Sequence, residues 1–163
     1  MAINIFSTDL VEIIEMLSQK AKYAMRALLY LARAEPEQPV LISEISERQV
    51  VPRKFLEMIL LELKRHGVVH SYRGKHGGYA LAKKPDDIFF GQVIRLIDGP
   101  LAQLPCASKT AYRRCDDCED EETCAIRRIL GEVRDSTARI LDHTSLADVM
   151  GGKVADLVQG AGI

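Results

Sequence analysis

Four cysteines lie within nineteen residues, in the stretch PCASKTAYRRCDDCEDEETC. They are Cys106, Cys115, Cys118 and Cys124, and the chain of 163 residues contains no other cysteine. Thiolate sulfur is the ligand that zinc and iron-sulfur clusters prefer in proteins. Thiols at this spacing therefore predict a metal or cofactor site, or a thiol redox centre.

The ligand type alone leaves several cofactors open. Four thiolates suit a [2Fe-2S] cluster, a [4Fe-4S] cluster or a structural zinc ion, and a cofactor-free thiol switch is the remaining alternative. A catalytic pair at Cys115 and Cys118 is disfavoured, because a reactive thiolate needs an electropositive setting. The segment instead carries six acids: Asp116, Asp117, Glu119, Asp120, Glu121 and Glu122. For a cluster, these acids predict a low reduction potential.

The charge is divided unevenly along the chain. Residues 17–84 contain thirteen Lys or Arg against six Glu, whereas the whole chain has a net charge of -1. A basic part joined to an acidic part indicates that only the first meets a polyanion. An electron-transfer or redox enzyme is the less favoured reading, because the glycine-rich RGKHGG lacks the strand-to-helix context of a nucleotide-binding loop.

Composition limits the class of protein. The chain is 47% hydrophobic and 28% charged, so it can bury a core, and its length fits one domain, or one domain with an accessory arm. It has no apolar run long enough for a membrane helix and no secretory signal, which predicts a cytoplasmic protein without a membrane partner.

The elements that position these residues follow from periodicity. We expect a core-facing helix from Ser18, with Ala24, Ala27, Leu28 and Leu31 on its apolar side. A short second helix in ISEISERQV has Ser43 as its expected N-cap. Pro52 suits the first position of a third helix, which Gly67 ends.

The third helix has two different faces. One arc holds Phe55, Leu56, Ile59, Leu60 and Leu63, and the other holds Lys54, Glu57, Met58, Leu61 and Arg65. Two strand-like runs follow, at 68–72 and 79–82, joined by a basic loop that contains Arg73, Lys75 and His76. Three helices and a hairpin predict a winged helix-turn-helix, with the third helix in the major groove of DNA.

The second half is expected to carry a short helix in FGQVIRLID and a long one after Cys124. The long helix has an apolar stripe that an isolated chain would leave exposed, which favours a homodimer seam over an intramolecular core. The residues of this stripe are Ile126, Ile129, Leu130, Val133, Ile140 and Leu141.

The chain resembles the bacterial Rrf (type two) transcription regulators, of the IscR, NsrR and RirA kind. The matching segments are LSQKAKYAMRALLYLA, ISERQVVPRKFLEMILLELKRHGVV, YRGKHGGYALA and VIRLIDGPLA, followed by cysteines at the family's location. The resemblance implies a mainly α fold with a small β wing, and a winged-helix homodimer on an inverted-repeat operator. It implies a transcriptional regulator, most often a repressor, and not an enzyme.

The resemblance also implies site residues. The expected DNA contacts are Ser43, Arg53, Lys54, Glu57, Met58, Arg73, Lys75 and His76. Arg73 matches the wing arginine that enters the minor groove, whereas Met58 stands where some relatives have a polar residue. Arg127 replaces a histidine ligand of some relatives and Lys22 an acidic ligand of others, which makes Cys115 the candidate fourth ligand.

The expected organisation has five parts. They are an N-terminal extension at 1–16, a winged helix-turn-helix at 17–84, a connecting helix and cysteine-rich cluster loop at 85–124, a dimerisation helix at 125–149 and a flexible tail at 150–163. The predicted function is a DNA-binding regulator controlled by an iron-sulfur cluster that senses iron, redox state or nitric oxide, with zinc or a thiol switch as alternatives.

Overall fold

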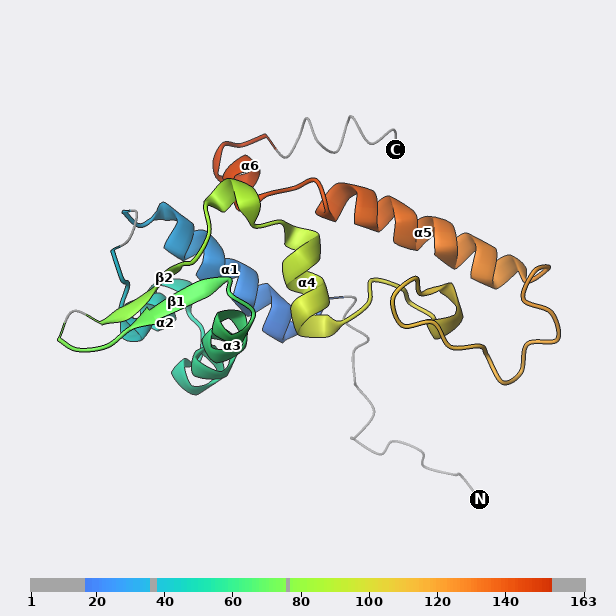
Figure 1. Ribbon diagram of the computed structural model, residues 1–163, viewed down its shortest axis with the longest axis horizontal. Helices are drawn as coiled ribbons and strands as arrows, with labels where there is room; N and C mark the ends of the chain where they lie inside the picture. Colours follow the sequence, from blue (N-terminus) through green and yellow to red (C-terminus); the bar gives the residue numbers. More distant parts are fainter. Residues whose placement is uncertain (1–16, 36–37, 76, 154–163) are drawn as a thin grey trace, which may run out of the picture.

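Helix α1 (Gln19–Arg33) lies at the centre of the helical body (Figure 1). The computed structural model describes residues 17–35, 38–75 and 77–153, so the predicted extension at 1–16 and most of the predicted tail lie outside the described residues. The Ser18 hydroxyl caps α1 by accepting a hydrogen bond from the Ala21 amide at 3.0 Å. The four predicted apolar residues of α1 are all buried in the core.

Helices α2 (Ile42–Gln49) and α3 (Arg53–Arg65) form the helix-turn-helix. The prediction that Ser43 caps α2 is wrong: the cap position is Leu41, and Ser43 lies inside the first turn. The reason is tertiary, because Val40 pairs with Tyr79 of the wing through two backbone hydrogen bonds of 2.8 and 2.9 Å. This bridge directs the chain into a helix at Ile42. Pro52 is the N-cap of α3 and not its first residue, so the helix begins at Arg53, one residue later than predicted.

The predicted apolar arc of α3 forms the centre of the core. Leu56, Ile59, Leu60 and Leu63 are fully buried, and Phe55 packs edge-on against Tyr23 with ring centroids 5.8 Å apart. Gly67, with φ of 67°, follows α3 and turns the chain into the wing. Strands β1 (Val69–Tyr72) and β2 (Gly78–Leu81) pair antiparallel, with Val69 opposite Leu81 and Tyr72 opposite Gly78.

The next elements complete the same core. The short turn η1 (Pro85–Asp87) leads to α4 (Phe90–Asp98), which packs along α1. Helix α6 (Leu146–Met150) returns to α1 and η1, and Leu146 is fully buried. The core therefore extends past residue 84 to Ile88, Val93, Ile94 and Leu146.

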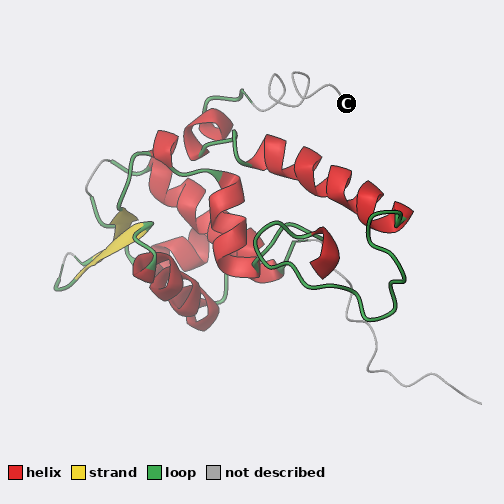
Figure 2. Ribbon diagram, turned by 45° about the vertical axis from the view of Figure 1, so that its right-hand side comes forward, coloured by secondary structure: helices red, strands yellow, loops and turns green. Residues whose placement is uncertain are grey.

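Helix α5 (Ala125–Leu141) differs from the other long helices, because none of its residues is fully buried. It extends from the body of the molecule, with the cysteine segment and the short turn η2 (Pro105–Ala107) near its N-terminus and the wing at the opposite end of the molecule (Figure 1). Figure 2 shows the same mainly helical body, with the strands of the wing at one side. The predicted fold class is confirmed.

Candidate functional site

The outer face of α3 is exposed, as its pattern predicts. Lys54, Glu57 and Met58 all lie in solvent, and the Met58 side chain is 56% exposed. Arg53 Nε lies 3.2 Å from Glu57 Oε1, one helical turn away. This exposed pair adds little stability, but it holds the Glu57 carboxylate beside a cation. Helix α3 thus has one face in the core and a charged face open to a partner.

The turn before α3 contains an unusual residue. Val50 has φ of 52° and ψ of 53°, the left-handed region that glycine normally occupies after a helix. The Val50 amide donates to Glu47 O and the Val51 amide donates to Ser46 O, which satisfies the last carbonyls of α2. The Ser46 hydroxyl returns a hydrogen bond to Val51 O at 2.7 Å. These bonds fix the direction in which α3 leaves the turn.

The wing is held against the start of α2 by a close approach of backbones. A Cβ on Gly78 would lie 2.4 Å from Val40 O, so only glycine allows the bridge at this point. Arg73 and Lys75 are exposed in the loop between β1 and β2, whereas the predicted contact His76 lies outside the described residues. The wing and the outer face of α3 are parts of one body, because α3 packs directly on β1.

The cysteine segment is irregular between η2 and α5. Cys106 is buried in η2, while Cys115, Cys118 and Cys124 are partly exposed. A hydrogen bond with Cys106, helped by desolvation, raises the pKa of Cys115 to about 11. Partial burial and the neighbouring Cys124 raise the pKa of Cys118. Cys118 also raises the pKa of Cys115, so the four thiols are neighbours within one segment.

The four thiols do not meet at a single point. Within the described part of the chain, no three His, Cys, Asp or Glu side chains converge as a ready-made metal site. Cys124 is the cap of α5, and its sulfur accepts a hydrogen bond from the Arg127 amide at 3.5 Å. By donor type the segment fits a thiolate-bound cofactor, and the four thiols would have to move closer together to enclose one.

Arg127, which stands in place of a histidine, holds the segment together. Its Nε donates to Cys106 O at 3.0 Å, and its Nη1 donates to Glu121 O at 3.2 Å. Its guanidinium carbon lies 6.0 Å from the centre of the Tyr112 ring. Tyr112 in turn donates to the Glu121 carboxylate at 2.6 Å. The sequence alone indicated only that Arg127 is not a ligand, and this positioning role was missed.

A second arginine of α5 strengthens the attachment to η2. Arg134 donates to Ala107 O and pairs with Asp135 at 2.8 Å, while Lys109 Nζ lies 2.7 Å from the same carboxylate. Hydrogen bonds from Arg134 and then Lys109 lower the pKa of Asp135 well below its usual range. The N-terminal half of α5 and the cysteine segment are thus joined by several polar contacts.

The C-terminal end of α5 is joined to α4. Arg95 forms a bidentate pair with Asp142, with distances of 2.5 and 2.9 Å. A Cβ on Gly91 would lie 1.9 Å from Asp142 Oδ1, so glycine makes room for this carboxylate. No local pattern in the sequence predicts this junction, because the partners are 47 residues apart.

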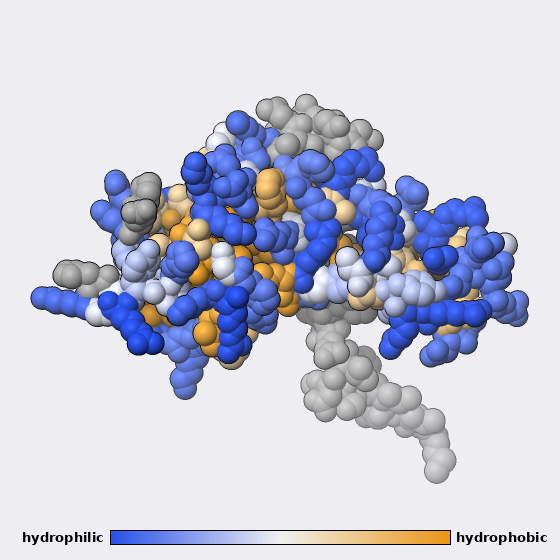
Figure 3. All heavy atoms as spheres, viewed as in Figure 1, coloured by the Kyte–Doolittle hydropathy of each residue, from blue (hydrophilic) through white to orange (hydrophobic). Residues whose placement is uncertain are grey.

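The apolar stripe of α5 divides into two parts. Ile126 and Ile129 are 64% and 63% exposed, and Val133 is 38% exposed. Leu130 and Ile140 are half-buried, whereas Leu141 packs against the chain's own core. The exposed apolar surface therefore lies on the N-terminal half of the helix. In the face that Figure 3 draws, hydrophilic side chains surround the apolar residues at this end of the molecule.

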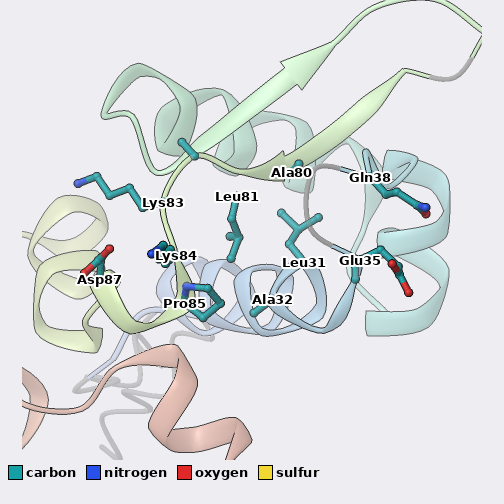
Figure 4. Close-up of a pocket in the computed structure, with 12 residues that line it drawn as sticks. Leu31, Ala32, Glu35, Gln38, Ala80, Leu81, Lys83, Lys84, Pro85 and Asp87 are labelled. Atoms are coloured by element: carbon teal, nitrogen blue, oxygen red, sulfur yellow. The ribbon is translucent and has the colours of Figure 1, made fainter.

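A pocket of about 730 Å³ opens between the end of α1 and the chain that leaves β2. Leu31 and Leu81 point into it, and Lys83 and Asp87 lie at its edge (Figure 4). None of the predicted site residues lines this pocket.

Across the described ranges, no helix combines the length and the apolar character needed to cross a membrane.

The comparisons with known proteins agree with this geometry. A family model described as "Rrf2: Iron-dependent Transcriptional regulator" matches residues 17–152. The chain is 46% identical over 149 residues to an rrf2-like HTH-type transcriptional regulator of Rhodobacter capsulatus, which covers 88% of this chain and 99% of the relative.

Solved structures give the same result. CymR, the global cysteine regulator of Bacillus subtilis, superposes with a TM-score of 0.67 at 29% identity, over 82% of this chain and 94% of CymR. IscR of T. potens also gives a TM-score of 0.67 at 29% identity, over 84% of this chain and 87% of IscR. With the helix-turn-helix, the wing and the long helix in place, the chain belongs to the Rrf2 family of HTH-type transcriptional regulators.

Proposed function

We propose that the protein is a homodimeric repressor whose affinity for an inverted-repeat operator is controlled by an iron-sulfur cluster. The proposed ligands are Cys106, Cys115, Cys118 and Cys124. When bound, such a cluster supplies a centre that reacts with oxidants or nitric oxide and is lost when iron is scarce.

The DNA half of the proposal is supported by the exposed face of α3 and the wing. Lys54 on α3 and Arg73 and Lys75 on the wing project from one rigid body. Phosphate contacts from such residues supply affinity, and contacts from the recognition helix supply sequence preference. We propose Ser43, Arg53 and Glu57 as further contacts, because all three belong to the helix-turn-helix pair.

The dimer half is supported by the exposed stripe of α5. Ile126, Ile129 and Val133 form an apolar strip on a helix that lacks buried residues. A second copy of α5 packed on this strip would bury it, and the two-fold symmetry would present two α3 helices to two half-sites. The half-buried Leu130 and Ile140 would complete the contact.

The single observation that carries the control mechanism is the way the cysteine segment is attached. The segment starts after α4 and ends at the cap of α5, and Arg95 and Asp142 join the other end of α5 back to α4. Bringing four thiols together around a cofactor would shorten the segment and shift α5 relative to α4. We infer that this shift changes the spacing of the two recognition helices, by the ~1 to 3 kcal/mol that allosteric coupling commonly reaches.

The test begins with anaerobically purified protein. Visible absorption and the content of iron, sulfide and zinc identify the cofactor, and operator titrations compare the loaded and the metal-free protein. We expect Cys118→Ala and Cys124→Ala to lose the absorption and change operator affinity together. Loss of absorption with unchanged operator affinity would refute the coupling between the cofactor and operator binding. It would not contradict the presence of the cofactor.

A cofactor-free thiol switch is the second candidate, because Cys115 has Cys106 as a neighbour and Cys118 has Cys124. Oxidation of each pair by a peroxide would form one disulfide, with two protons and two electrons passing to the oxidant. Metal-free protein that keeps its regulated operator binding and loses its free thiols on oxidation would favour this candidate. Zinc without iron would instead indicate a structural site.

A further inference from the structure

The outer face of α3 contains an exposed apolar centre. Met58 is 56% exposed and Leu61 is 45% exposed, so neither contributes much to the core. On the helix, Lys54 lies one turn before Met58 and Leu61 lies one turn after it. A methionine therefore stands at the middle of the surface that the recognition helix presents to its partner.

The charges around Met58 select the kind of partner. The two acids of α3 both lie against basic groups, Glu57 beside Arg53 at 3.2 Å and Glu62 beside Lys20 at 2.5 Å. The helix also carries Lys54, Lys64 and Arg65. A face with this charge favours a polyanionic partner over a partner whose surface is apolar and carries few acids. Met58 is then expected to meet the floor of a DNA groove.

The chemistry of the groove restricts what Met58 can recognise. A thioether donates no hydrogen bond and accepts only weakly, so it cannot read the polar edges of the bases. The apolar group that base edges present in the major groove is the C5 methyl of thymine. A flexible thioether adapts its rotamers to cover such a methyl group.

We propose that Met58 is a specificity-determining residue that reads a thymine methyl group in each half-site. This inference rests on the proposed operator binding. The Arg53 and Glu57 pair beside Met58 provides polar contacts to neighbouring bases or phosphates. The operator of this protein therefore differs from that of a relative with a polar residue at this position.

The experiment isolates one methyl group. DNA bound by the purified full-length protein is selected from a random duplex pool, and each thymine of the selected half-site is replaced by deoxyuridine, which pairs identically and lacks the methyl. At one position the wild-type Kd should rise by about fourfold, the effect of exposing one methyl group. Replacement in both half-sites should give about fifteenfold, because independent contributions multiply.

Two variants complete the test. Met58→Gln should bind thymine and uracil duplexes equally, because its amide gains nothing from the methyl. The control Lys54→Ala should weaken binding to both duplexes and keep the thymine-to-uracil ratio. Both side chains are exposed, and thermal denaturation verifies that each variant is folded.

The outcomes separate the two proposals. Indifference of the wild type to uracil at every position, or an unchanged uracil penalty in Met58→Gln, would overturn the reading of thymine by Met58 while operator binding stands. If selection from the pool yields no preferred sequence, the proposed operator function is overturned. The reading of thymine by Met58, which rests on it, is then overturned as well.

Discussion

Replacing Val50 by glycine should make the protein more stable. Val50 is the one non-glycine residue with positive φ in the described ranges, and it is β-branched. A left-handed conformation brings the Cβ of an L-residue close to its own carbonyl oxygen, which costs roughly 1 to 2 kcal/mol. The side chain is 76% exposed, so little burial is lost when it is removed.

The expected gain is a difference between two terms. Glycine removes the strain, and it also gives the unfolded chain more conformational freedom, which costs about 0.5 to 1 kcal/mol. At the centres of the two ranges, about 1.5 and about 0.75 kcal/mol, the net increase in the free energy of unfolding is about 0.75 kcal/mol. For a chain of this size this corresponds to a rise of roughly 1 to 4 °C in Tm.

Urea denaturation of the wild type and two variants at one protein concentration measures the effect. Val50→Gly should raise the midpoint without changing the slope. Val50→Ala keeps the Cβ and removes only the branch, so it should gain less than glycine. A loss of stability in Val50→Gly, or an equal gain in Val50→Ala, would show that positive φ at this turn carries no strain.

Three further predictions concern the two ends of α5 and the cap of α6. Gly91→Ala should cost about 1 to 3 kcal/mol in thermal denaturation, and much less in a chain that also carries Asp142→Ala, because the added Cβ meets the Asp142 carboxylate. Hydrogen bonds from Ser145 lower the pKa of Asp148, so this cap contributes stability above the ordinary pKa of aspartate and loses it as the pH falls through the lowered pKa. Ser145→Ala should cost about 1 kcal/mol at neutral pH and flatten the acid limb of the stability curve. Ile129→Glu should convert the proposed dimer to a monomer in sedimentation equilibrium, whereas an unchanged mass would place the dimer seam elsewhere.

The helices and the wing could be predicted because their signals are local. The spacing of Leu56, Ile59, Leu60 and Leu63 shows which side of α3 is buried, and all four are buried. The start of α2 was misplaced at Ser43 because its position depends on the Val40 and Tyr79 bridge, which joins residues far apart in sequence. Intrinsic capping preference is weak compared with such a contact.

The candidate site was only partly accessible from the sequence. The spacing of the cysteines predicts that they belong to one site, but it contains no information on which thiols are neighbours in the fold. The same limit applies to Arg127, because its partners are backbone carbonyls of Cys106 and Glu121, which any residue type provides. The turn at Val50 and Val51 was expected, but the left-handed conformation of Val50 was not, because a glycine normally marks that conformation.

The attachment of α4 offers a physical route for the control that we propose, from the cysteine segment to the outer face of α3. Asp98, at the last turn of α4, binds the Ser18 amide at 2.9 Å and also its hydroxyl, which caps α1. Arg95, one turn earlier, binds Asp142 beyond the end of α5. Helix α4 is therefore fastened to α1 and to α5 within a single turn, and the cysteine segment begins directly after it. Since α1 packs on both α2 and α3, the displacement of α5 that we propose would reach α3 through packed helices.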